Sequence, residues 1–204
     1  MKKNIIIGVV IGLVVVAVGL TLWKGTGTAP EGPAAENGTA NQAPDTGQPQ
    51  SKILTDTFSI DLLPGWVQIE PAEGATAMAV DAADEISDPA ALEIGFRSYF
   101  AVTADTLGGK GISDYTATVK SELAGLIPGV AFINELDTTV GDRFAHFFEL
   151  TMTQQDIPFR VLMAVVSGRS GDDVWVLSFN TTAGMWERYR EAFYAVAQSF
   201  VVKR

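Results

Sequence analysis

Residues 158–167 read PFRVLMAVVS, and this run is apolar at both strand parities. Its alternating positions hold two apolar sets, which are Val161, Met163 and Val165 and, between them, Leu162, Ala164 and Val166. Successive side chains of a strand point to opposite faces of the sheet, so both faces of this strand must be covered. The run therefore predicts the centre of a sheet with a helix on each side.

Further strand-like runs lie on both sides of this one along the chain. Residues 174–180 follow it, and residues 75–80, 92–100, 131–136 and 143–153 precede it. Short connectors between the later runs favour antiparallel neighbours. At the start of the domain, residues 58–62 and 66–70 are predicted to form a hairpin-like pair around Pro64-Gly65.

Two segments have helical periodicity. The apolar face of the first consists of Tyr115, Val119, Leu123 and Leu126. Ser113 is predicted to cap this helix, and Pro128-Gly129 to end it. The second helix begins at about Thr182, and its apolar stripe consists of Trp186, Tyr189, Phe193, Val196 and Phe200. The fold class is therefore α+β, with a mainly antiparallel sheet between helices.

Three features together resemble the PsbP-like superfamily. They are the FSIDLLPGW opening at residues 58–66, the closing Gln198-Ser199-Phe200, and the order of four strands, a helix, four strands and a helix. The resemblance covers about residues 58–200 and implies an antiparallel sheet sandwiched by helices. It also implies an accessory or binding module. The resemblance carries no functional residue over to this sequence, so it informs the fold and not the activity.

Residues 1–24 are predicted to anchor the chain in a membrane. Lys2 and Lys3 precede an uncharged apolar run over residues 5–23, which as a helix would cross about 30 Å of hydrocarbon. The paired lysines favour a cytoplasmic N-terminus, and Trp23 suits the far interface. The prediction is a single-pass membrane protein with an extracytoplasmic C-terminal domain, and a cleaved signal peptide is the alternative.

Residues 25–50 are predicted to be a disordered linker, since they contain no large apolar side chain. Residues 51–204 then form the one globular domain. Two weak matches to the N-glycosylation pattern occur, at Asn37-Gly38-Thr39 and at Asn180-Thr181-Thr182.

Charge and cysteine content exclude several classes of function. The formal net charge is -10, and all of it arises after residue 50, where the sequence has 21 Asp and Glu but 11 Lys and Arg. Such a surface disfavours nucleic acid as a partner. The sequence contains no cysteine. Disulfides, thiolate metal sites and cysteine nucleophiles are therefore excluded.

Candidate catalytic residues are few. His146, the only histidine, shares strand parity with Phe148 and Leu150, which predicts a histidine packed at an apolar layer or its edge. Ser113 and Ser178 lack the glycine-flanked pattern of a serine nucleophile. No catalytic residue is therefore predicted.

Three polar segments are candidate ligand sites. Asp81, Asp84, Glu85 and Asp88 are read as solvated loop charges, with a cation site such as calcium as the alternative. Asp172-Asp173 is read as a turn. Gly108-Gly109-Lys110-Gly111 lacks the ending of a phosphate-binding loop and is read as a flexible lead-in to a helix. The sequence predicts no metal, cofactor or small-molecule site.

These features predict a non-catalytic accessory protein that contacts an envelope or membrane protein near the membrane surface. The acidic segment from Asp81 to Asp88 is predicted to steer that partner. The alternative is a small-ligand carrier or an unrecognised hydrolase with its site where the sheet edge meets a helix.

Overall fold

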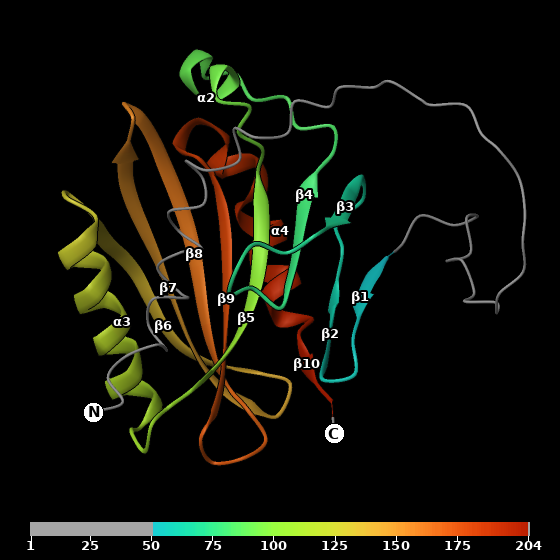
Figure 1. Cartoon of the computed structure of the whole chain (residues 1–204), viewed down its shortest axis with the longest axis vertical. Coiled ribbons are helices and arrows are strands. Elements are labelled where there is room, and N and C mark those ends of the chain that lie inside the picture. Colours follow the sequence, from blue (N-terminus) through green and yellow to red (C-terminus); the bar gives the residue numbers. More distant parts are fainter. Residues whose placement is uncertain (1–50, 204) are drawn as a thin grey trace, which may run out of the picture.

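The apolar run at residues 158–167 lies near the centre of the larger of two sheets. The computed structural model describes residues 51–203. Seven antiparallel strands follow the order β3-β4-β5-β9-β8-β7-β6 (Figure 1). Their bounds are β3 Trp66–Ile69, β4 Ala77–Asp81, β5 Tyr99–Thr106, β6 Ala131–Val140, β7 Arg143–Gln154, β8 Ile157–Ser167 and β9 Asp173–Thr182. The long strands β7, β8 and β9 are neighbours, as their short connectors predict.

A second, three-stranded sheet joins the two ends of the domain. It contains β1 (Lys52–Leu54), β2 (Phe58–Asp61) and β10 (Val201–Val202), in the order β1-β2-β10. The predicted pairing of residues 58–62 with 66–70 is wrong, because β2 pairs with β1 and β10 while β3 pairs with β4. Gly65, at φ +82°, lies in the turn between β2 and β3 and sends the chain from one sheet to the other.

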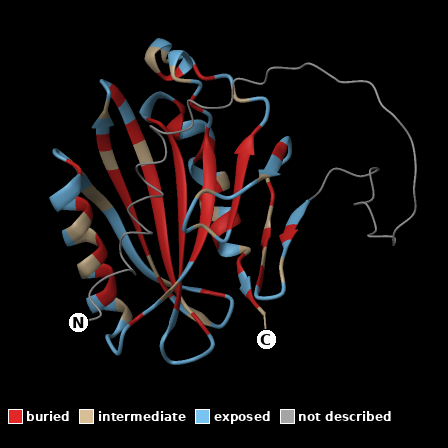
Figure 2. Ribbon diagram, viewed as in Figure 1, coloured by how far each residue is buried: buried red, intermediate tan, exposed pale blue. Residues whose placement is uncertain are grey.

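Two helices cover opposite faces of the large sheet. Helix α3 (Ile112–Leu126) contributes Tyr115, Val119 and Leu123 to one apolar core. Helix α4 (Trp186–Gln198) follows the 3₁₀ turn η3 (Ala183–Met185) and contributes to a second core. Figure 2 shows the buried strands of the sheet centre between exposed edges. The α+β prediction is confirmed, and so is the buried aromatic stripe of α4.

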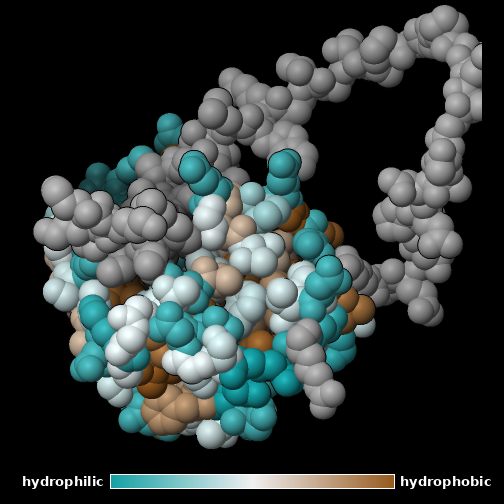
Figure 3. All heavy atoms as spheres, turned by 60° about the horizontal axis from the view of Figure 1, so that its bottom comes forward, coloured by the Kyte–Doolittle hydropathy of each residue, from teal (hydrophilic) through white to brown (hydrophobic). Residues whose placement is uncertain are grey.

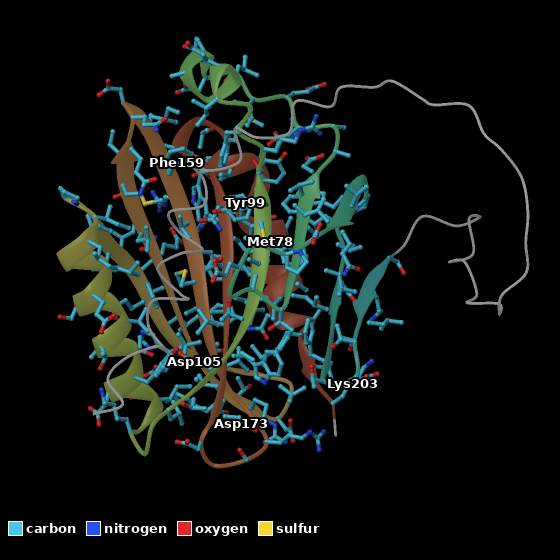
Figure 4. The ribbon with its side chains drawn as sticks, viewed as in Figure 1. Met78, Tyr99, Asp105, Phe159, Asp173 and Lys203 are labelled. Carbon is cyan, nitrogen blue, oxygen red and sulfur yellow. The ribbon has the colours of Figure 1, made fainter. Side chains whose placement is uncertain are left out.

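A polar contact adds to the attachment of α3. The hydroxyl of Tyr115 donates to Asp105 on β5 at 2.6 Å, near the lower end of the sheet in Figure 4. Burial raises the pKa of Asp105, although the hydrogen bond from Tyr115 opposes the rise. The pair therefore links α3 to a strand near the middle of the sheet.

The predicted strand over residues 92–100 is wrong except at its last two residues, Tyr99 and Phe100. Residues 89–93 form the short helix α2 (Pro89–Glu93), and β5 begins only at Tyr99. The carboxylate of Asp88 accepts hydrogen bonds from the amides of Ala90 and Ala91, at 2.9 and 3.0 Å. This side-chain cap and the proline that follows favour a helical turn over a strand.

The ends of α3 also differ from the prediction. The N-cap is Gly111, which has no side-chain cap, and Ser113 is an exposed residue inside the first turn. Leu126 is 57% exposed, and Ile127 occupies the core position instead. The helix ends at Leu126, so its buried apolar face stops at Leu123 and the next buried position is Ile127, after the helix.

No helix within residues 51–203 is long and apolar enough to span a bilayer. The predicted anchor at residues 1–24, the linker at 25–50 and the Asn37-Gly38-Thr39 pattern lie outside the described residues.

Candidate functional site

A fully buried carboxylate, Glu149, organises the polar cluster at the β6 edge of the sheet. Its side chain has 0% exposure. On β7 it shares strand parity with Ala145 and Phe147, which belong to the core beneath α4. Burial of an unpaired charge is strongly unfavourable, so Glu149 requires several donors.

Three side chains donate to Glu149. Arg160 on β8 donates from Nε and Nη2 to Oε2, at 3.1 and 2.5 Å. Tyr194 on α4 donates to Oε1 at 2.9 Å, and Asn134 on β6 donates to Oε2 at 3.2 Å. The Arg160 guanidinium also lies 4.9 Å from the centre of the Trp186 ring. We call Glu149 and these three donors the Glu149 network.

The backbone of β6 is irregular where it joins this network. The register between β6 and β7 shifts between Ile133 and Leu136. Asn134 has a left-handed backbone at φ 51°, a conformation that asparagine tolerates better than most residues. The bulge brings an amide donor within reach of Glu149.

The network holds Glu149 in its ionised form. Burial raises the pKa of Glu149, but the hydrogen bonds from Arg160, Tyr194 and Asn134 outweigh burial, so its pKa lies below the ordinary range. Burial and then the bond to Glu149 raise the pKa of Tyr194 to about 12. The phenol therefore remains a donor throughout the physiological range.

An open pocket of about 410 Å³ lies beside the network, where β6 meets α4. We call it the β6–α4 pocket, and its lining residues are Asn134, Glu135, Leu136, Arg190 and Tyr194. Arg190 lies with its Nε 3.5 Å from Oε1 of Glu149, and its side chain is 47% exposed. Leu136 is 54% exposed. The pocket thus combines a cation and an apolar side chain at its rim.

The lining of the pocket has no nucleophile paired with a base. It contains no serine, threonine, lysine or histidine, as far as the described residues show. Glu149 accepts at both carboxylate oxygens and is held ionised, so it is a poor general acid and has little free capacity as a base. The arrangement suits binding of a polar group better than proton transfer.

His146 lies at the same sheet edge, on the opposite face. Its Nδ1 is 2.6 Å from Asp137 and its Nε2 is 3.4 Å from Glu135, and both carboxylates come from β6. Lys120 of α3 pairs with Glu135. The ring centre is 6.1 Å from that of Phe148, so His146 is packed at the edge of an apolar layer as predicted. The two carboxylates flank different ring nitrogens and therefore do not converge on one metal position.

Replacing His146 by phenylalanine is expected to change the free energy of unfolding by less than about 1 kcal/mol at neutral pH. Asp137 and Glu135 are 66% and 42% exposed, so water can replace the imidazole as their partner. Urea denaturation followed by tryptophan fluorescence would measure the change. A loss above about 2 kcal/mol would show that His146 is a structural cross-link.

The acidic segment from Asp81 to Asp88 is not a group of solvated charges. Asp81 is buried, and the hydroxyl of Tyr189 donates to Asp81 at 2.7 Å and to Asp84 at 3.0 Å. Asp88 caps α2, and only Glu85 is exposed. The prediction of a shared acidic surface is therefore wrong, because these carboxylates satisfy buried or terminal donors.

Burial raises the pKa of Tyr189, and the hydrogen bonds to Asp81 and Asp84 raise it further. The phenol therefore stays protonated and bridges the two carboxylates. Across residues 51–203 no group of three or more His, Asp or Glu side chains is placed to hold a metal ion.

Two further segments that the sequence suggests as ligand or modification sites have structural roles. The amide of Gly109 donates to the carboxylate of Asp172 at 2.9 Å, so an acidic side chain occupies the loop considered for phosphate. Asn180, Thr181 and Thr182 are buried in β9, which is incompatible with glycosylation of the folded domain. Ser178 is buried at the sheet centre, and its hydroxyl lies 3.4 Å from the Asn180 amide.

The sequence alone does not predict the Glu149 network. Its one signal is a glutamate between Phe148 and Leu150 in an otherwise apolar stretch. Its donors lie on three other elements, and only the folded chain brings them together. The alternative reading, a ligand or hydrolase site where the sheet edge meets a helix, stays a prediction; the β6–α4 pocket lies at such a junction.

The sequence matches no family model and no curated protein. Among solved structures, the chain is similar to the cyanobacterial PsbP protein CyanoP of Synechocystis sp. PCC 6803, with 13% identity and a TM-score of 0.58 over 80% of this chain and 99% of that chain. LpqN of Mycobacterium tuberculosis, a protein involved in cell envelope biogenesis, has 15% identity and a TM-score of 0.57 over 78% and 88%.

The Saccharomyces cerevisiae Ran-binding protein Mog1p is also similar, with 12% identity and a TM-score of 0.50 over 71% of this chain and 89% of that chain. At these identities the likeness shows the fold. The chain has the PsbP-like fold that its opening and closing motifs indicated.

Proposed function

We propose that this chain of PsbP-like fold is a non-catalytic accessory protein of the cell envelope. It binds a protein partner through the rim of the β6–α4 pocket. The observation that carries this proposal is the lining of the pocket, which offers Arg190, Tyr194 and Leu136 for contact but no nucleophile. A site of this composition recognises a surface rather than converting a substrate.

The position of the pocket at a sheet edge supports a protein partner. Leu136 is exposed at the rim, and on the face shown in Figure 3 brown side chains form separate patches rather than one continuous area. A small apolar contact with a charged neighbour is typical of a weak interface. Anchoring through residues 1–24 would raise the local concentration of the domain around membrane neighbours, so a weak interface would be occupied.

The similar proteins support an accessory role in the envelope. LpqN is involved in cell envelope biogenesis, and Mog1p binds the protein Ran. These functions are those of proteins that share the fold of this chain, so they support the proposal by analogy. A small-ligand carrier or hydrolase is the second candidate, favoured by the location of the pocket where the sheet edge meets α4.

The chain has no cysteine, so one introduced thiol can test both location and contact. We expect Leu136→Cys in whole cells to react with a membrane-impermeant maleimide. With a short thiol-to-amine crosslinker it should give one adduct of defined mass. Val67→Cys, on the opposite edge strand β3, is the control because Val67 is also exposed, at 45% against 54% for Leu136.

Val67→Cys should react with the maleimide but give no adduct. Identical adduct patterns from both variants would contradict the proposed surface. Absence of maleimide labelling in intact cells, with labelling after lysis, would contradict the extracytoplasmic location.

A further inference from the structure

Arg190 is surplus to the Glu149 network. Glu149 already accepts four hydrogen bonds from Arg160, Tyr194 and Asn134, at 2.5 to 3.2 Å. The Nε of Arg190 lies 3.5 Å from Oε1 of Glu149, beyond normal hydrogen-bond length. Within residues 51–203 the guanidinium has no other acceptor. Its N–H groups are therefore available at the pocket.

The charges around the pocket leave an excess of one positive charge. Arg160 and Arg190 face the single carboxylate of Glu149. Glu135, the other acid of the lining, is engaged by Lys120 and His146. A local cation is unusual on a chain whose net charge is -10. The pocket therefore favours a singly charged anion over a neutral or cationic group.

We infer that the β6–α4 pocket binds one carboxylate of the partner, held by Arg190 beside Leu136. This inference rests on the proposed function and specifies the chemistry of its contact. The flat guanidinium of arginine matches the two oxygens of a carboxylate, whereas a phosphate dianion requires more charge than one surplus arginine supplies. Contact with the exposed Leu136 favours a carboxylate that has an aliphatic side chain beside it. The pocket volume of about 410 Å³ accommodates a few side chains.

The side chains of the β6–α4 pocket are also preorganised for binding. Arg190 and Tyr194 are four residues apart on α4 and so lie on one side of the helix. Glu149 holds the Tyr194 hydroxyl, and the bulge of β6 places Asn134 and Leu136 at the same rim. A ligand therefore meets side chains that are already oriented, which lowers the entropic cost of binding.

The test is a titration of the full chain, in neutral detergent, with small carboxylate probes and a neutral counterpart. Binding is monitored through the NMR signals of the arginine Nε–H groups and the leucine methyl groups. The probes are blocked acetyl-alanyl-leucyl-glutamate amide, its glutamine counterpart, acetyl-alanyl-leucine with a free C-terminal carboxylate, and acetate. We expect the glutamate peptide to shift the Arg190 and Leu136 signals and to bind at least about tenfold more tightly than the glutamine peptide.

Arg190→Gln should abolish this preference for the carboxylate. Arg188→Gln should retain it, and is a matched control because Arg188 is on the same helix and 50% exposed, with its guanidinium 3.6 Å from Glu85. Stronger binding of the leucine acid than of the glutamate peptide would assign the site to a C-terminus, and the reverse to a side chain. Either result supports the inference.

Equal binding of the glutamate and glutamine peptides, or unchanged selectivity in Arg190→Gln, would overturn the carboxylate site. Acetate binding as tight as that of the peptides would overturn the role of Leu136 and show a general anion site. If the carboxylate site fails while the Leu136→Cys adduct persists, the proposed protein-binding surface stands without it.

Discussion

The Glu149→Ala variant is expected to lose about 3 kcal/mol of its free energy of unfolding. The substitution leaves the Arg160 guanidinium without its acceptor, and it removes the partners of Tyr194 and Asn134. We place the effect at the low end for a broken buried pair because the Arg160 side chain is 23% exposed and water can reach it. Urea denaturation followed by tryptophan fluorescence would measure the change.

A double variant separates the charge from the packing. Glu149→Leu combined with Arg160→Met removes both charges and keeps the volume, so it should recover most of the loss seen in Glu149→Ala. If Glu149→Ala alone costs less than about 0.5 kcal/mol, the network contributes little to stability and the pocket is not preorganised by it.

The ionised state of Glu149 also predicts a pH dependence. Its pKa is lower in the folded chain than in the unfolded chain, so its contribution is fully present above the unfolded pKa of about 4.3. That contribution is lost as the pH falls through the folded pKa. The stability difference between the native chain and Glu149→Gln should therefore be constant from about pH 6 to 7 and shrink below about pH 4.

The second large effect is expected for Phe193→Ala, which should lower the free energy of unfolding by about 3–5 kcal/mol. Phe193 is fully buried on α4. Its ring centre lies 5.3 Å from those of Phe179 and Tyr189 and 5.9 Å from that of Trp66. Removing the ring leaves a cavity between α4 and the sheet that rigid aromatic neighbours fill poorly.

Phe144→Ala is the matched control, since it is the same substitution at a site that is 42% exposed on β7. It should cost less than about 1 kcal/mol. Phe193 precedes Tyr194 on α4, so Phe193→Ala should also weaken probe binding at the β6–α4 pocket. Equal losses in both variants would mean that the α4 core is not a major source of stability.

Periodicity in the sequence determined most of the secondary structure. The run at residues 158–167 is a buried strand between β7 and β9, and Trp186, Tyr189 and Phe193 line the buried face of α4. These predictions succeed because the spacing of apolar residues reports directly which side of an element is buried. The secondary-structure prediction is wrong where a local interaction outweighs the apolar pattern. The side-chain cap of Asp88, for example, favours a helix at residues 89–93.

Only the tertiary structure decided which elements pair and which polar groups meet. Strand β2 lies beside β10, far away in sequence, rather than beside β3, which follows it directly. Likewise, the sequence places Asp81 in a polar loop segment, whereas in the fold the hydroxyl of Tyr189 on α4 donates to it. Local patterns contain no information about such partners, because pairing depends on contacts made when distant segments close on one another.

The candidate site is also decided by the tertiary structure. Glu149 is tolerated inside the fold because Asn134, Arg160 and Tyr194 reach it from β6, β8 and α4. The sequence alone shows a charged residue in an apolar run and no means of stabilising it. The donors must converge in three dimensions to offset the desolvation of the carboxylate. Because they already satisfy both carboxylate oxygens, Arg190 pairs with Glu149 only at 3.5 Å.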